Sequence, residues 1–292
     1  MATSVVAIPG SEDHAGKLAR ALGAELIEPE LRRFPDGELY VRLPKAAEHV
    51  VLCGSLYPAP AERFMELALI AGTARDLGAK RVGLVAPYLA FMRQDVAFAA
   101  GEGVTARYFA RLVSGVIDWM VTVDPHLHRL PSLANVYTIP TAVARAAPAI
   151  AEWVRREVAE PVLVGPDAES EQWVAAVAEA CGAPFEICTK TRRGDRDVSV
   201  ALRGRSWNGH TPVLIDDIVS TGKTMIEATR TLRAAGSAPP MCVAIHAVFA
   251  DALHAELAAA GAAGIVTCNT IPHASNQICV AASIADAARA FV

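Results

Sequence analysis

The residues with the clearest chemical potential lie in one segment, residues 213–224, which reads VLIDDIVSTGKT. An apolar run ends in two adjacent carboxylates, Asp216 and Asp217, and a Ser-Thr-Gly-Lys-Thr turn follows. Consecutive backbone N–H groups at such a turn, at the start of a helix, form a cradle for an anion. Carboxylates repel phosphate, so we expect them to face sugar hydroxyls or a metal ion. The segment therefore predicts a site for a phosphorylated ligand.

Two other interpretations explain less of this segment. A P-loop of the form G-x-x-x-x-G-K-[ST] matches Gly222, Lys223 and Thr224, but Asp217 stands where its first glycine belongs, and a carboxylate there would face the phosphates. A plain strand-to-helix turn with a Ser or Thr cap explains one hydroxyl, but not two carboxylates beside a Thr-Gly turn.

The composition is that of a globular chain without general affinity for polyanions. Lys and Arg number 27 against 31 Asp and Glu, a net charge of −4, which argues against broad binding to nucleic acid or to an anionic membrane. Neither a membrane-spanning run nor a secretory signal is recognisable. The 6 cysteines form no Cys-x-x-Cys pair, which argues against a zinc site. Buried free thiols in a reducing cytoplasm are the expected arrangement.

Short apolar runs alternate with amphipathic stretches along most of the chain. The runs predict strands at residues 50–52, 81–86, 184–188, 213–215, 241–248 and 264–267. Helical spacing followed by glycine predicts helices at residues 62–77, 175–181, 224–235 and 252–260. This alternation predicts an α/β fold with parallel sheets flanked by helices.

The two halves of the chain resemble each other in pattern. Residues 51–91 can be laid over residues 213–249, with a longer loop in the first copy. About two domains are also what this length suggests. We place the boundary near residues 140–147, which gives domains at residues 1–145 and 146–292.

Residues 213–224 resemble the phosphoribosyl-diphosphate (PRPP) motif of phosphoribosyltransferases and PRPP synthetases. Further segments resemble ribose-phosphate pyrophosphokinases (PRPP synthetases), in that family's order: RFPDGE at 33–38, PYLAFMRQD at 87–95, TVDPH at 122–126, VGPD at 164–167 and KTR at 190–192. The last loop, the turn at 220–222 and residues 125–128 look closer to the archaeal-type branch. The resemblance spans nearly the whole chain.

The resemblance implies two similar phosphoribosyltransferase-type domains, an N-terminal half with the ATP site and a C-terminal half that binds ribose 5-phosphate. The implied reaction transfers the β,γ-diphosphoryl group of ATP to O1 of ribose 5-phosphate, giving PRPP and AMP, with Mg²⁺ as cofactor. It also implies a homo-oligomer with the ATP site shared between subunits. Two alternatives remain: a phosphoribosyltransferase that consumes PRPP, and a catalytically silent regulatory subunit.

The resemblance also assigns individual residues. Transition-state charge would be stabilised by the loop cations Lys190 and Arg192. ATP would be bound by Phe34, Asp36, Glu38, Arg93, Gln94, Asp95 and His126. Ribose 5-phosphate would be bound by Asp167, Asp216, Asp217, Ser220, Thr221, Gly222, Lys223 and Thr224. Mg²⁺ would be held by Asp124, His126 and Asp167.

Several of these residues have a plain structural alternative. Phe34 also suits a core position, and Arg93 a solvated loop. Asp167 suits a helix N-cap, because it precedes a helical pattern. The segment around Lys190 and Arg192 also reads as a solvated charged loop. His126 and His128 suit either a ligand or a structural role.

We predict weak or absent allosteric inhibition by ADP. The regulated branch of the family that this chain resembles usually carries basic residues after the RQD segment and an arginine near residues 44–49. Here residues 96–100 contain no cation, and residues 44–49 lack an arginine. A second anion pocket needs several converging cations, because each phosphate otherwise loses water without gaining a partner. Inhibition by ADP measured across ATP concentrations should be purely competitive. Inhibition that persists at saturating ATP and is sigmoidal in ADP would refute this prediction.

Overall fold

The computed structural model describes residues 2–127, 129–193, 197–201 and 209–292, with the backbone alone at 189–193 and 197–201. The chain forms two compact units. The first contains Met1–Arg145, Thr270–Pro272 and Ala281–Val292, and the second contains Ala146–Asn269 and His273–Val280. The break after Arg145 lies within the expected boundary region. The expected range 146–292 is not one unit, however, because the C-terminal segment packs with the first unit.

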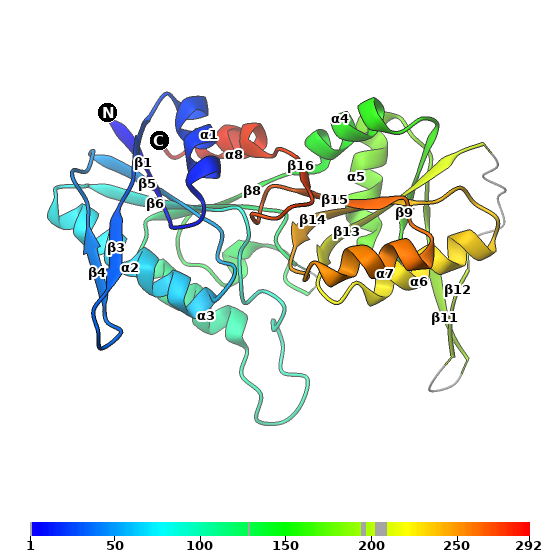
Figure 1. Cartoon of the computed structure of the whole chain (residues 1–292). Helices are drawn as coiled ribbons and strands as arrows, with labels where there is room; N and C mark the ends of the chain where they lie inside the picture. The colour runs from blue at the N-terminus through cyan, green and yellow to red at the C-terminus, as the bar shows by residue number, and fades with distance from the viewer. Residues whose placement is uncertain (1, 128, 194–196, 202–208) are drawn as a thin grey trace. The chain divides into compact units, whose positions relative to one another are not determined.

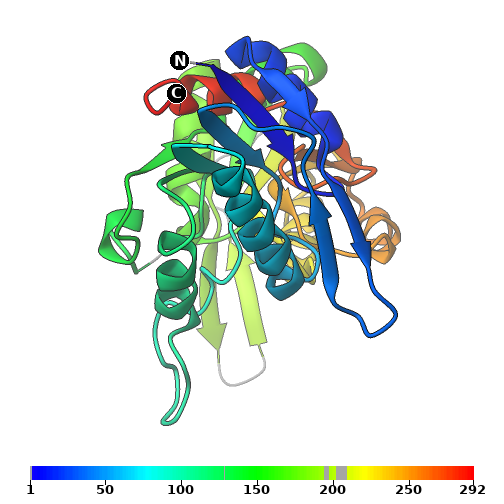
Figure 2. The ribbon, with the colours of Figure 1, turned by 90° about the vertical axis from the view of Figure 1, so that its left-hand side faces the viewer.

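The first unit is built on a six-stranded parallel sheet with the order β2-β1-β5-β6-β7-β8. Its strands are β1 (Thr3–Ala7), β2 (Glu25–Ile27), β5 (His49–Cys53), β6 (Arg81–Ala86), β7 (Trp119–Val123) and β8 (Thr141–Ala144). Helices α1 (Glu12–Leu22) and α8 (Ala281–Ala288) pack together on one face, and α2 (Pro60–Asp76) and α3 (Thr105–Ser114) lie on the other (Figure 1). An antiparallel hairpin of β3 (Glu30–Arg33) and β4 (Leu39–Arg42) extends from this unit (Figure 2).

The second unit repeats this plan with the sheet order β10-β9-β13-β14-β15-β16, again parallel throughout. Its strands are β9 (Pro161–Gly165), β10 (Phe185–Ile187), β13 (Thr211–Val219), β14 (Met241–Ala247), β15 (Gly264–Cys268) and β16 (Asn276–Ile278). Helices α4 (Ala147–Glu157) and α5 (Glu171–Cys181) pair on one face, and α6 (Lys223–Ala234) and α7 (Ala252–Ala260) pair on the other (Figure 1). A hairpin of β11 (Thr189–Arg193) and β12 (Asp197–Ala201) completes it.

The repeat that the sequence predicts is therefore present in the topology. In each unit the first strand pairs with the second and the third, and a hairpin is inserted before the third. β5 and β13 hold the same place, as the overlay of residues 51–91 on 213–249 predicts. The central strands are buried on both faces because helices cover both sides, which explains their continuous apolar runs.

Two strands differ from expectation in ways that matter for the site. β13 continues to Val219, beyond the predicted end at Ile215, so it includes Asp216 and Asp217. Lys190 and Arg192 lie in a strand rather than a loop. In the part of the chain that the structure describes, no helix is long and apolar enough to cross a membrane.

Gly83 is predicted to be essential for packing in the first unit. A Cβ at Gly83 would lie 1.9 Å from Trp119 Cε2, and the Trp119 ring is itself stacked on Phe291 at 4.9 Å. Gly83→Ala should lower stability by about 1–3 kcal/mol, because the indole cannot move without losing that stack. The matched control is Gly72→Ala in α2, where no atom lies within 4 Å of the new Cβ. The control should raise the thermal unfolding midpoint or leave it unchanged. Equal midpoints for the two variants would contradict this account.

Candidate functional site

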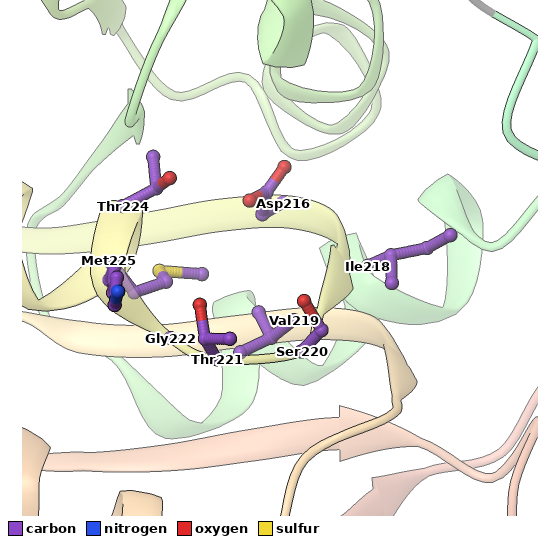
Figure 3. Close-up of a pocket in the computed structure, with 9 residues that line it drawn as sticks. Asp216, Ile218, Val219, Ser220, Thr221, Gly222, Thr224 and Met225 are labelled. Atoms are coloured by element: carbon purple, nitrogen blue, oxygen red, sulfur yellow. The ribbon is translucent and has the colours of Figure 1, made fainter. Parts of the chain in front are cut away.

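The end of β13 and the start of α6 form a small hollow that is open to solvent. It is lined by Asp216, Ile218, Val219, Ser220, Thr221, Gly222, Lys223, Thr224 and Met225. The Asp216 carboxylate lies across the hollow from the turn at residues 220–222 (Figure 3). The predicted anion-binding turn and one predicted carboxylate are thus brought together.

Gly222 shapes this turn, for two independent reasons. It adopts the left-handed conformation with φ +69°, and a Cβ there would lie 2.1 Å from Leu253 Cδ1 of α7. Gly222 is also the N-cap residue of α6 and offers no side chain to cap the helix. The N–H groups of the first helical turn therefore remain for an anion, supported by the positive end of the helix dipole.

The two aspartates of the motif lie on opposite faces of β13, the strand that carries them. Asp216 is half-buried and lines the hollow, whereas Asp217 is 4% exposed and does not. Asp217 Oδ1 accepts a hydrogen bond from Ile218 N at 2.7 Å. Neighbouring residues of a strand point to opposite faces, so an extended β13 divides the pair. Of the two carboxylates only Asp216 lines this hollow, and the expected binding of ribose by Asp217 stays a prediction.

Asp167 has the structural role that the sequence left open. It follows β9, and its Oδ1 accepts a hydrogen bond from Glu169 N at 3.1 Å, capping a short 3-10 turn at Ala168–Ser170. Its main-chain oxygen accepts from Ser170 Oγ at 2.6 Å. This N-cap function accounts for an aspartate at this position, and binding of a ligand or metal by Asp167 stays a prediction.

Phe34, one of the residues expected to bind ATP, lies in the turn between β3 and β4 and is 39% exposed, so it is not a core residue. The Arg32 guanidinium lies 4.7 Å from the Phe34 ring centroid, and the Tyr40 ring meets Phe34 edge-on at 6.1 Å. Asp36 and Glu38 are exposed in the same turn, where Asp36 Oδ1 accepts from Glu38 N at 3.1 Å. These contacts hold an aromatic ring at the surface with carboxylates beside it.

The RQD segment combines one exposed cation with two residues that tie the segment to other parts of the first unit. Arg93 is exposed. Gln94 Oε1 accepts from Thr105 Oγ1 at the start of α3, at 3.1 Å. The Asp95 side chain is 2% exposed and accepts from Arg129 Nη1 at 3.0 Å. Arg129 was not among the predicted site residues, because nothing in the local pattern links residues 34 positions apart.

Asp124 stands where β7 ends, in the positive-φ conformation at +30°. Its side chain is 3% exposed, and its Oδ1 accepts from Arg145 Nη1 at 2.9 Å. His126 is half-buried, and His128 lies outside the described residues. A non-glycine residue with positive φ stores strain that proteins tolerate mainly at functional sites. Arg145, like Arg129, is a partner that the sequence patterns did not reveal.

The donor set suits magnesium held largely by phosphate oxygens. Within the described ranges, no group of three or more His, Cys, Asp or Glu residues is arranged to hold a metal ion. Mg²⁺ commonly uses one or two carboxylates and takes its other ligands from water and substrate phosphates. A single buried carboxylate at a strand end, such as Asp124, fits that mode.

Lys190 and Arg192 belong to β11, which pairs antiparallel with β12 in the register Lys190↔Val200 and Arg192↔Val198. The prediction of a loop was wrong at these two positions, because the charged residues and Gly194 in the sequence favoured a loop where β11 pairs with β12. Gly194 itself lies outside the described residues. The catalytic role of both cations stays a prediction.

The turn at Gly222 is backed by α7, whose first residues are tied to the segment after β15. His273 Nε2 lies 3.5 Å from Asp251 Oδ1, just before α7. Ser275 N donates to His273 Nδ1 at 3.1 Å, and Ser275 Oγ lies 2.7 Å from the same nitrogen. Since Nδ1 accepts, the neutral tautomer with its proton on Nε2 fits. Burial lowers the pKa of His273, with Asp251 acting in the opposite direction.

This shift predicts a pH-dependent stability. The unfolded chain binds a proton near the ordinary pKa of 6.5, and folded His273 binds it only at lower pH, so stability falls as pH drops below 6.5. Between about pH 7.5 and about pH 5.5, the thermal unfolding midpoint of His273→Gln should fall less than that of the parent protein. His49→Gln, in the first unit, is the control and should keep the parental loss. Parallel pH profiles for His273→Gln and the parent would contradict the assignment.

Two family models match the chain, one in each half. Residues 3–116 match the family model of the N-terminal domain of ribose phosphate pyrophosphokinase, and residues 132–283 match that of the phosphoribosyl transferase domain. A ribose-phosphate pyrophosphokinase of Methanopyrus kandleri is 33% identical over 274 residues, 93% of each chain. One of Halobacterium salinarum is 32% identical over 280 residues, covering 95% of this chain and 97% of that one.

The fold has a solved counterpart. The crystal structure of phosphoribosylpyrophosphate synthetase from Mycobacterium smegmatis superposes with a TM-score of 0.82, at 24% identity, covering 99% of this chain and 98% of that one. The two matched domains and their order thus agree with one family. The chain belongs to the ribose-phosphate pyrophosphokinase family.

Proposed function

We propose that this chain is a ribose-phosphate diphosphokinase that transfers the β,γ-diphosphoryl group of ATP to O1 of ribose 5-phosphate, giving PRPP and AMP. The observation that carries the proposal is the hollow at the end of β13, where Asp216 faces the N-terminus of α6. A carboxylate opposite an anion cradle suits a ligand with hydroxyls at one end and phosphate at the other. Family membership supplies the reaction type.

Ribose 5-phosphate is assigned to the second unit. Its phosphate accepts hydrogen bonds from the backbone N–H groups of residues 220–224, with the hydroxyls of Ser220, Thr221 and Thr224 as further donors. Asp216 accepts hydrogen bonds from the ribose hydroxyls. Asp217 supports the backbone from the opposite face of β13.

ATP is assigned to the first unit. The exposed Phe34 ring covers one face of the adenine of ATP bound to a neighbouring subunit, and Asp36 and Glu38 accept from its amine or from the ribose hydroxyls. Arg93 presents a planar fork to phosphate oxygens. Gln94 and Asp95 position this segment through Thr105 and Arg129.

In the transfer, ribose O1 attacks the β-phosphorus in line with the departing oxygen of AMP. A bond forms between O1 and the β-phosphorus, and the bond from that phosphorus to the α–β bridging oxygen breaks. Lys190, Arg192 and Arg93 stabilise the negative charge on the transferred group and on AMP. Asp124 and His126 of the first unit would hold Mg²⁺, which would neutralise phosphate charge, and the metal role of Asp167 stays a separate prediction. The protein's own contribution is positioning and electrostatic stabilisation.

A homo-oligomer in the cytoplasm is part of the same proposal. The hairpin of β3 and β4 extends from the first unit (Figure 2), and the exposed Phe34 in its turn suits a residue that reaches a neighbouring subunit's nucleotide. The six cysteines are all free thiols in the structure, as in proteins of a reducing compartment.

The direct test is AMP formation from ATP by the purified chain, with identification of PRPP as the second product. AMP should form only when ribose 5-phosphate and Mg²⁺ are both present. Replacing ribose 5-phosphate by ribose should abolish the reaction, because the anion cradle then has no ligand. AMP formation that does not depend on ribose 5-phosphate, or ATP hydrolysis to ADP alone, would refute the proposal.

The two motif aspartates should differ in their effects. Asp216→Asn removes a charged acceptor from the hollow and should raise KM for ribose 5-phosphate about 10- to 100-fold, the usual value of a hydrogen bond to a charged group. Asp217→Asn keeps an Oδ1 acceptor for Ile218 N and should raise KM far less. Steady-state kinetics with ribose 5-phosphate varied distinguishes them. A larger rise in KM for ribose 5-phosphate in Asp217→Asn than in Asp216→Asn would contradict the assignment of ribose binding to Asp216.

Lys190→Ala tests where the hairpin cation acts. If Lys190 stabilises charge that develops during transfer, kcat should fall about 10²- to 10³-fold while KM for ATP and ribose 5-phosphate changes little. Lys190→Arg should restore part of kcat, because the charge is retained. A change confined to KM would mean that Lys190 only assists binding.

A further inference from the structure

Asp124 and Arg145 form an ion pair at the carboxyl edge of the first sheet. Asp124 follows β7 and Arg145 follows β8, and these strands are parallel neighbours with Val123 opposite Ala144. Asp124 N also donates to Ala144 O at 3.2 Å, which fixes the two strand ends together. The guanidinium Nη1 lies 2.9 Å from Asp124 Oδ1.

The two side chains of this pair differ sharply in exposure. The Asp124 side chain is 3% exposed, whereas the Arg145 side chain is 66% exposed. Asp95 and Arg129 form a similar pair, in which the Asp95 side chain is 2% exposed and the Arg129 side chain is 52% exposed. In each case a buried acid assigned to ligand binding lies beneath an arginine that reaches it from solvent. A buried carboxylate needs a compensating charge, and an exposed arginine supplies one that can also turn away.

We propose that Arg145 is the resident counter-cation of Asp124 and competes with the divalent metal for that carboxylate. This inference deepens the proposed function and rests on it for the metal role of Asp124. With Arg145 at 2.9 Å, the carboxylate is already neutralised, and a divalent cation approaching it is repelled by the guanidinium. Metal reaches Asp124 only when Arg145 moves away.

The competition has a use in the reaction. The phosphates of ATP bring negative charge with the metal, and Arg145 gains an anionic partner when it leaves Asp124. The nucleotide-free protein then holds metal weakly, and metal binding is coupled to nucleotide binding through exchange of ionic partners. The exposed guanidinium makes this exchange possible without any change in the strands.

The test is binding of Mn²⁺, a paramagnetic substitute for Mg²⁺, to the protein without ATP or ribose 5-phosphate, measured by electron paramagnetic resonance. Arg145→Gln should bind Mn²⁺ about tenfold more tightly than the parent, because a nearby positive charge is removed. Arg145→Met is a second variant of the same charge, so the test does not depend on one substitution folding well. Arg145→Lys should remain close to the parent.

Two controls separate this competition from a general charge effect. The rise in Mn²⁺ affinity should disappear in the double variant Asp124→Asn with Arg145→Gln, because the Asp124 carboxylate that would bind the metal is absent. Arg75→Gln removes an equal charge from the same unit, where Arg75 pairs with Asp118 at 3.1 Å before the opposite end of β7. This control should leave Mn²⁺ binding unchanged.

Three results would overturn the proposal. Mn²⁺ affinity could fail to rise in both Arg145→Gln and Arg145→Met, it could still rise when Asp124→Asn is also present, or it could rise equally in Arg75→Gln. Because the measurement contains neither substrate, its outcome is independent of the AMP assay. An active enzyme with no gain would reject the competition alone. A gain in a protein that forms no AMP would reject the proposed reaction and leave the competition standing.

Discussion

The candidate site depends on one close contact, the packing of the Gly222 backbone against Leu253 at the junction of β13 and α6. Only glycine satisfies both the left-handed φ and the space left by Leu253. The contact makes the chain turn sharply, begins α6 at Lys223 and aims the first N–H groups of that helix at the hollow. Moving Leu253 or adding a Cβ would shift the phosphate cradle relative to Asp216, and the two ends of one ligand would no longer fit together.

The repeated topology gives the molecule two sheets of equal plan with different chemistry at their carboxyl edges. In the second unit this edge carries backbone N–H donors and a half-buried carboxylate, which suit a sugar phosphate. In the first unit it carries a buried carboxylate covered by an arginine, which suits a site for metal and polyphosphate. Parallel sheets bind ligands at this edge because the strand ends and the helix N-termini meet there.

Much of this arrangement follows from local sequence. The β13–α6 turn, the helix stops at glycines and the repeat are short-range patterns, and the structure contains them. Strand length was less predictable, because two adjacent carboxylates are untypical of a strand interior and the predicted strand stopped at Ile215, whereas β13 continues to Val219. Arg129 and Arg145 were missed because their partners are 34 and 21 residues away and only the fold brings them together. The charges around Lys190 favoured a loop, whereas residues 189–193 form a strand that pairs with β12.

The most direct test of the central claim is a crystal structure of the chain with ribose 5-phosphate. The account predicts the phosphate within hydrogen-bond distance of backbone nitrogens in residues 220–224, with Gly222 still left-handed. It further predicts ribose hydroxyls at the Asp216 carboxylate and no sugar contact with Asp217. A phosphate bound elsewhere, or a ribose held by Asp217 instead of Asp216, would contradict it.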